Sequence, residues 1–152
     1  MSDAPNIPAP PHMPREQFRA LAHRMADWVA DYWDRVETLP VLSRAKPGDT
    51  LAALPLHPPE HGLASWDEVF ADLERIILPG ITHWQHPAFF AYFSANASGP
   101  AVLGELLSAG LGVQGMLWST SPACTAVEMR VMAWLAAASG LPSAFTPAAR
   151  LR

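Results

Sequence analysis

The sequence predicts a mainly helical chain in which four helices are joined by long loops. Apolar residues recur at steps of three and four along four stretches, which is the spacing of one helix face. Serine, proline and glycine punctuate these stretches as they do helix ends. No segment has the valine and isoleucine runs of a buried parallel strand, and no glycine-rich phosphate loop follows a strand. A chain of 152 residues is expected to form one core.

The first helix is predicted from Pro14 to Glu37. Proline suits a helix start, because its missing N–H has no partner in the first turn. The charged residues lie mostly off an apolar stripe made of Phe18, Leu21, Met25, Trp28 and Tyr32. From Thr38 to Ala64 the sequence predicts a long extended connector, because prolines at 40, 47, 55, 58 and 59 prevent the helix from continuing.

The second helix is predicted to begin at Ser65, which forms a capping box with Glu68. Its end is expected at the Pro79-Gly80 pair. The apolar face of this helix consists of Val69, Phe70, Leu73, Ile76 and Ile77.

The third helix is predicted from Pro100 to Gly110 or Gly112. Its apolar face is made of Val102, Leu103, Leu106 and Leu107. The fourth helix has Ser121 as cap and Pro122 at the first helical position, and Gly140 followed by Pro142 ends it. Its stripe is formed by Val127, Val131, Trp134, Leu135 and Ala138.

Composition excludes several classes of function. The net charge is −4, and one lysine and nine scattered arginines give no basic stripe for nucleic acid. A single cysteine, Cys124, allows no intrachain disulfide and no paired-cysteine zinc site, so we expect a reducing, cytoplasmic location. The longest apolar stretch, Pro100 to Trp118, contains Glu105, so no membrane span is expected. Half of the residues are hydrophobic and only 16% are charged, which suggests that a partner covers some apolar surface.

The stretch "ITHWQHPAFFAYF", from Ile81 to Phe93, concentrates aromatic rings and imidazoles in a pattern that is neither helical nor alternating. Such a cluster could be ordinary core, a membrane-facing loop, or the wall of a pocket for a flat ligand. His83 and His86 could ligate a metal, but no third and fourth ligand follow at a fixed spacing, so no metal site is predicted. Cys124 at a helix start could be a nucleophile, although a buried apolar role is the simpler interpretation.

Lys46, the only lysine, lies in a Pro-Gly turn. A lysine that attacks a carbonyl must be desolvated or tuned by its neighbours, whereas such a turn stays solvated. Lys46 is therefore interpreted as a surface residue.

Three segments carry a resemblance to a known family: "PGITHWQHPAFFAYFSANAS", "GPAVLGELLSAGLG" and "WSTSPACTAVEMRVMAWL". In order and spacing they resemble the N-terminal region of the group II pyridoxal-phosphate-dependent amino-acid decarboxylases, such as the aromatic-L-amino-acid, tyrosine and histidine decarboxylases. The resemblance covers Pro14 to Phe145. It implies a helical N-terminal arm plus the first helices of a fold-type-I enzyme, with the large α/β domain absent from these residues.

The resemblance also implies site residues and partners. Trp84, Tyr92 and Phe93, with Ser94, Ala95 and Asn96, would help to wall the pocket for an aromatic amino acid. Gln114 and Met116 would reach toward the pocket of a neighbouring subunit in a homodimer. The sequence departs from the animal enzymes at Ser94-Ala95-Asn96, where Ser94 or Asn96 would have to replace an expected hydroxyl, and at Ala126, where the family usually has an acidic residue.

In the family, the groups that hold pyridoxal 5'-phosphate, including its lysine, come later than any residue here. The resemblance thus divides the chain into a flexible proline-rich arm (1–13), a dimer-wrapping helical arm with the aromatic pocket loop (14–98), the start of the cofactor domain (99–145) and a divergent tail (146–152). No catalytic residue is expected in the chain itself. The expected function is that of the N-terminal part of a decarboxylase, inactive by itself and completed by a C-terminal region. The alternative is a non-catalytic helical interaction module that dimerises with, or modulates, an intact decarboxylase.

Overall fold

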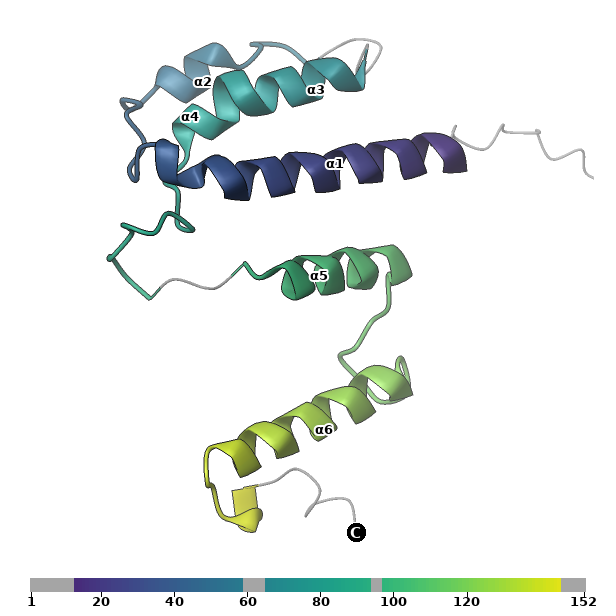
Figure 1. Ribbon diagram of the computed structural model, residues 1–152. Helices are drawn as coiled ribbons and strands as arrows, with labels where there is room; N and C mark the ends of the chain where they lie inside the picture. The colour runs from purple at the N-terminus through teal and green to yellow at the C-terminus, as the bar shows by residue number, and fades with distance from the viewer. Residues whose placement is uncertain (1–12, 59–64, 94–96, 146–152) are drawn as a thin grey trace, which may run out of the picture. The chain divides into compact units, whose positions relative to one another are not determined.

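The computed structural model describes residues 13–58, 65–93 and 97–145, and every regular element in these ranges is helical (Figure 1). The expected mainly helical fold is confirmed. The chain divides into two compact units, Met1–Asn96 and Ala97–Arg152. Most of the proline-rich arm, the tail 146–152 and the predicted site residues Ser94, Ala95 and Asn96 lie outside the described residues.

The first unit begins with α1, Arg15–Arg35, and a 3-10 turn, Val36–Thr38, continues it. Pro14 precedes the first helical residue, and its carbonyl accepts the N–H of Phe18 at 2.9 Å. The predicted helix from Pro14 to Glu37 is thus confirmed, with a tighter last turn.

The prolines predict an extended connector, but part of it is helical. A short helix, α2, spans Asp49–Ala53 and fits between Pro47 and Pro55. Gly48 precedes it at φ 97°, a left-handed conformation that glycine adopts without steric cost. The Asp49 carboxylate accepts the N–H of Lys46 at 2.8 Å, which closes the turn before the helix. The prediction was wrong here because a helix of this length carries too few residues to show a period.

The second predicted helix is built from three consecutive pieces: α3, Trp66–Asp72; a π-helical turn, Leu73–Ile77; and α4, Leu78–Gly80. The Ser65 hydroxyl accepts the N–H of Glu68 at 3.3 Å, so the predicted cap is confirmed, as is the end at Gly80. The wide turn changes which residues face inward. Ile77, expected on the apolar face, is 41% exposed, and Leu78 is buried instead.

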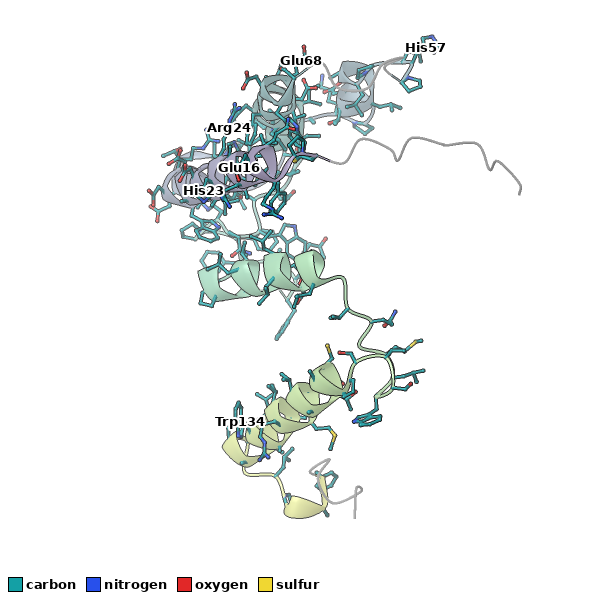
Figure 2. The ribbon with its side chains drawn as sticks, turned by 90° about the vertical axis from the view of Figure 1, so that its right-hand side faces the viewer. Glu16, His23, Arg24, His57, Glu68 and Trp134 are labelled. Carbon is teal, nitrogen blue, oxygen red and sulfur yellow. The ribbon has the colours of Figure 1, made fainter. Side chains whose placement is uncertain are left out.

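The core of the first unit contains Val36, Phe70, Ile76 and Leu78, which are all at least nine-tenths buried. Helix α1 lies alongside α3, and Arg24 joins them (Figures 1 and 2). Its guanidinium carbon lies 4.0 Å from the centre of the Phe70 ring, and its Nη1 donates to the Asp67 carboxylate at 2.5 Å. The apolar face of the second predicted helix is therefore largely covered within the chain. The start of α1 is not, because Phe18 is 56% exposed.

The second unit contains α5, Gly99–Leu111, and α6, Pro122–Ala138, followed by a 3-10 turn, Ser143–Phe145. The predicted punctuation is confirmed. Gly112 ends α5 in the left-handed region, and the Ser121 hydroxyl accepts the N–H of Cys124 at 3.4 Å. The left-handed Gly140 follows α6.

Large apolar side chains of the second unit are exposed, Trp134 of α6 among them (Figure 2). Among its described residues, Ala136 and Ser121 are the buried ones. Leucines expose their side chains along the length of α5, at positions 103, 106, 107 and 111. In the described part of the chain, no helix has the length and apolar character needed to cross a membrane.

Candidate functional site

The aromatic segment, which we define as Ile81 to Phe93, follows α4 as irregular backbone. It begins with a hydrogen bond from the N–H of His83 to the carbonyl of Val41 at 2.9 Å. Two short turns follow. The backbone N–H of His86 donates to the carbonyl of His83 at 3.0 Å, and the N–H of Phe89 donates to the carbonyl of His86 at 2.9 Å. The segment is thus anchored at His83 and folds locally after it.

His83 is buried, with 2% of its surface exposed. Its Nδ1 lies 2.9 Å from the hydroxyl oxygen of Tyr32 on α1. Burial lowers the pKa of His83, and the neighbouring His86 lowers it further. The imidazole is therefore neutral at neutral pH, and its tautomer decides which group donates.

Tyr32 also belongs to a polar cluster, formed with Trp28 and Arg35 of α1 and Glu74 of the π-helical turn. Its ring stacks on Trp28, with centroids 5.9 Å apart and planes at 3°, and burial raises the pKa of its hydroxyl. The indole N–H of Trp28 donates to Glu74 in the π-helical turn at 2.7 Å, and Arg35 donates to the same oxygen at 2.5 Å. The hydrogen bond from Arg35 is the main cause that lowers the pKa of Glu74.

Further along the segment, three rings form what we call the Trp84 cluster: Trp84, Phe89 and Tyr92. Trp84 lies 4.8 Å from Phe89 and 5.7 Å from Tyr92 between ring centroids, and its plane is within 17° of that of Tyr92. The cluster faces outward, because Tyr92 is 89% exposed and Trp84 45%. Tyr92 has φ 56°, and it is the one non-glycine residue with positive φ among those described.

The predicted site residues that the structure describes are divided between the two units. Trp84 and Tyr92 stack on each other, whereas Phe93 is fully exposed. Gln114 and Met116 belong to the second unit, in the loop between α5 and α6, where the N–H of Met116 donates to the Gln114 side chain at 3.0 Å.

No group of three or more His, Cys, Asp and Glu side chains in the described ranges could hold a metal ion. One ring nitrogen of each candidate histidine has a hydrogen-bond partner. Nδ1 of His83 meets Tyr32, and Nδ1 of His86 accepts the N–H of Ala88 at 2.9 Å. Cys124, on α6, is partly exposed.

Sequence reasoning missed the contact between Tyr32 and His83, which are 51 positions apart. One signal was available. Tyr32 lies on the apolar stripe of its helix, and a tyrosine on a buried stripe usually needs a hydrogen-bond partner for its hydroxyl.

The chain is similar to known proteins over most of its length. Residues 47–149 match the pyridoxal-dependent decarboxylase conserved domain. The chain is 47% identical over 133 residues to a phenylacetaldehyde synthase of Arabidopsis thaliana, covering 88% of this chain and 27% of that protein. It is 45% identical over 130 residues to an aromatic-L-amino-acid decarboxylase of Catharanthus roseus, covering 86% of this chain and 26% of that one.

Among solved structures, the chain is similar to Catharanthus roseus tryptophan decarboxylase in complex with L-tryptophan. The TM-score is 0.83 at 43% identity, over 90% of this chain and 29% of that one. The chain therefore spans between a quarter and a third of the length of these three proteins.

Proposed function

The chain belongs to the pyridoxal-dependent decarboxylase family, and from this premise we propose that it is the N-terminal part of a pyridoxal-phosphate-dependent carboxy-lyase acting on an aromatic L-amino acid. The observation that supports this most directly is the exposed Trp84 cluster. It lies within the residues that match the family, and its rings are free to contact a ligand or another part of the protein.

In this proposal the cluster forms one wall of the substrate pocket. The nearly parallel rings of Trp84 and Tyr92 present flat apolar surface, which suits a planar side chain packed face to face or edge to face. Once covered, the same rings exclude water from the reacting group. Phe93, Ser94, Ala95 and Asn96 are proposed to extend the wall, and the Tyr92 hydroxyl is available to hydrogen-bond a polar group on the substrate.

Pyridoxal phosphate, when bound, supplies the electron sink that makes loss of carbon dioxide feasible. The described residues do not by themselves make a site for it. Lys46 is exposed in its turn, so burial does not desolvate its amine for attack on a carbonyl. We therefore propose that the cofactor is held by a further region of the protein, which provides its lysine.

We propose that the exposed apolar helix faces are covered in a homodimer. Apolar side chains exposed over most of α5 and α6, and at the start of α1, are typical of surfaces buried by another chain or region. In such an assembly Gln114 and Met116 would reach the neighbouring subunit's pocket. The single cysteine favours a cytoplasmic location.

The test is to express the chain together with the coding sequence that follows Arg152, and to measure product from phenylalanine, tyrosine and tryptophan. We expect carbon dioxide and the corresponding amine in equal amounts. An aldehyde in place of the amine would instead align the protein with the phenylacetaldehyde synthase to which it is similar.

The alternative, a non-catalytic interaction module, rests on the same exposed helix faces. It predicts that the 152-residue chain binds an intact decarboxylase and changes its rate, while no lysine domain is encoded downstream. This is measured by adding the purified 152-residue chain to an intact decarboxylase and following binding and rate; no binding and no change in rate would reject the alternative.

A further inference from the structure

We propose that Tyr32 and His83 are a positioning pair, which fixes the start of the aromatic segment against α1 and so sets the placement of the Trp84 cluster. The pair holds the segment on the helices. Its consequence for substrate binding rests on the proposed function, but the placement itself does not.

His83 is deeply buried. It has the lowest exposed fraction of the buried residues described, below that of the apolar Ile76 at 4%. A buried imidazole loses its hydration, and this cost is offset only if its nitrogens find partners. The Tyr32 hydroxyl provides one at 2.9 Å. A histidine at this position is therefore specified by a particular partner and not by apolar packing alone.

His83 is hydrogen-bonded to two different parts of the unit. Its ring bonds to Tyr32 on α1, and its backbone N–H bonds to Val41 in the connector. Two bonds in different directions fix both the position and the rotation of the residue. The backbone bonds that follow, from Trp84 to Thr82 and from His86 to His83, are local to the segment. They define its shape but not its place on the helices.

Trp84 follows His83 directly in the sequence. The rotation of His83 therefore determines the direction in which the indole leaves the backbone. The indole in turn contacts both other rings of the cluster, at 4.8 Å from Phe89 and 5.7 Å from Tyr92. A change of the hydrogen bond at His83 is thus transmitted to the exposed rings within one residue.

The rest of the polar cluster holds the Tyr32 ring in place. Tyr32 stacks on Trp28, whose indole N–H is bonded to Glu74. This arrangement limits where the Tyr32 hydroxyl can lie. It also explains why phenylalanine at position 32 is a clean test, since the ring and its stacking remain while only the hydroxyl is removed.

The experiment is hydrogen–deuterium exchange of the 152-residue chain, resolved to peptides from the aromatic segment, α3 and α6. In Tyr32→Phe we expect the amides of His83, Trp84, His86 and Phe89 to exchange about threefold to tenfold faster, because one net hydrogen bond no longer opposes local opening. Exchange in α3 and α6 should match the unchanged chain.

Two substitutions of the histidine provide a matched pair. His83→Asn carries its amide group at the same number of bonds from Cα as Nδ1, so it can still meet Tyr32 and should keep slow exchange in the segment. His83→Gln places its amide group where Nε2 was, and it should behave as Tyr32→Phe does. The difference between the two separates a specific contact from general loss of an imidazole.

Two results would overturn the inference. One is unchanged exchange in the aromatic segment of Tyr32→Phe. The other is equal acceleration in the segment and α3, since the pair would then only contribute to global stability.

The complete enzyme tests the functional consequence separately. There, Tyr32→Phe should raise the KM of the aromatic substrate about threefold to tenfold, with a smaller change in kcat, because one hydrogen bond of placement is lost. Faster exchange in the segment with an unchanged KM would reject the proposed pocket wall and leave the positioning pair standing. A Trp84→Ala variant that loses substrate binding, in a chain where Tyr32→Phe changes no exchange rate, would do the reverse.

Discussion

Tyr92 combines an exposed side chain with a strained backbone, and this predicts opposite effects of substitution on stability and on activity. An L-residue in the left-handed region costs about 1–2 kcal/mol, and glycine escapes this cost. Glycine also loses about 0.5–1 kcal/mol relative to alanine through its freer unfolded state. At φ 56° we therefore expect Tyr92→Gly to equal or exceed Tyr92→Ala in stability, by up to about 1.5 kcal/mol.

Phe90 provides the matched control for this comparison. It is 92% exposed, like Tyr92, but it has no positive φ. Phe90→Gly should accordingly be about 0.5–1 kcal/mol less stable than Phe90→Ala, the opposite order to that at position 92. Urea unfolding of the 152-residue chain, with the slope of the transition checked for constancy, measures all four variants.

The activity of the complete enzyme should respond differently. Both substitutions of Tyr92 remove the ring that stacks on Trp84 and the hydroxyl, which together amount to about 2–4 kcal/mol, or about 30-fold to 1000-fold in kcat/KM. The same order of stability at positions 90 and 92 would refute the backbone argument. Full activity in Tyr92→Ala would refute the pocket wall.

Phe70→Ala should cost about 3–5 kcal/mol in urea unfolding, as a buried ring does, whereas Phe18→Ala should cost less than about 1 kcal/mol. The isolated chain should self-associate and bind a hydrophobic dye; a monomer by light scattering without dye binding would contradict this. Because the pKa of His83 is lowered on folding, the unfolded chain takes up a proton first, so the free energy of unfolding should fall as the pH drops below about 6.5; His83→Gln should flatten that dependence. Borohydride reduction with pyridoxal phosphate should label no specific site at Lys46 by peptide mapping, and stoichiometric labelling with decarboxylation would overturn its surface role.

The helix ends were predictable from sequence because they depend on local chemistry. Ser65 and Ser121 cap their helices through their own side chains, and Gly112 and Gly140 adopt the left-handed conformation that ends a helix. Each of these signals involves residues within one turn. Among the α-helices in the described ranges, the short α2 was missed, since five residues are too few to establish a period.

The sequence indicated the residues of the candidate site but not their arrangement. The density of rings from Ile81 to Phe93 identified the segment, and the stacking of Trp84 on Tyr92 agrees with a shared role. The anchor of the segment, by contrast, is a contact between His83 and a helix 51 positions earlier, and no local pattern specifies a pairing over that distance. The left-handed backbone of Tyr92 was equally hidden, because tyrosine carries no preference for it.

The π-helical turn Leu73–Ile77 holds one residue more than an α-helical turn would in its place. In a regular α-helix, an extra residue turns everything after it by about 100°. A wide turn absorbs such a residue, because its hydrogen bonds span one residue more. Deleting one residue within Leu73–Ile77 is therefore expected to leave Leu78 in the core and Gly80 against Thr50, whose Oγ1 lies only 2.9 Å from the place a Cβ on Gly80 would occupy. Natural variants that differ by one residue in this helical element are expected to carry the change at this turn.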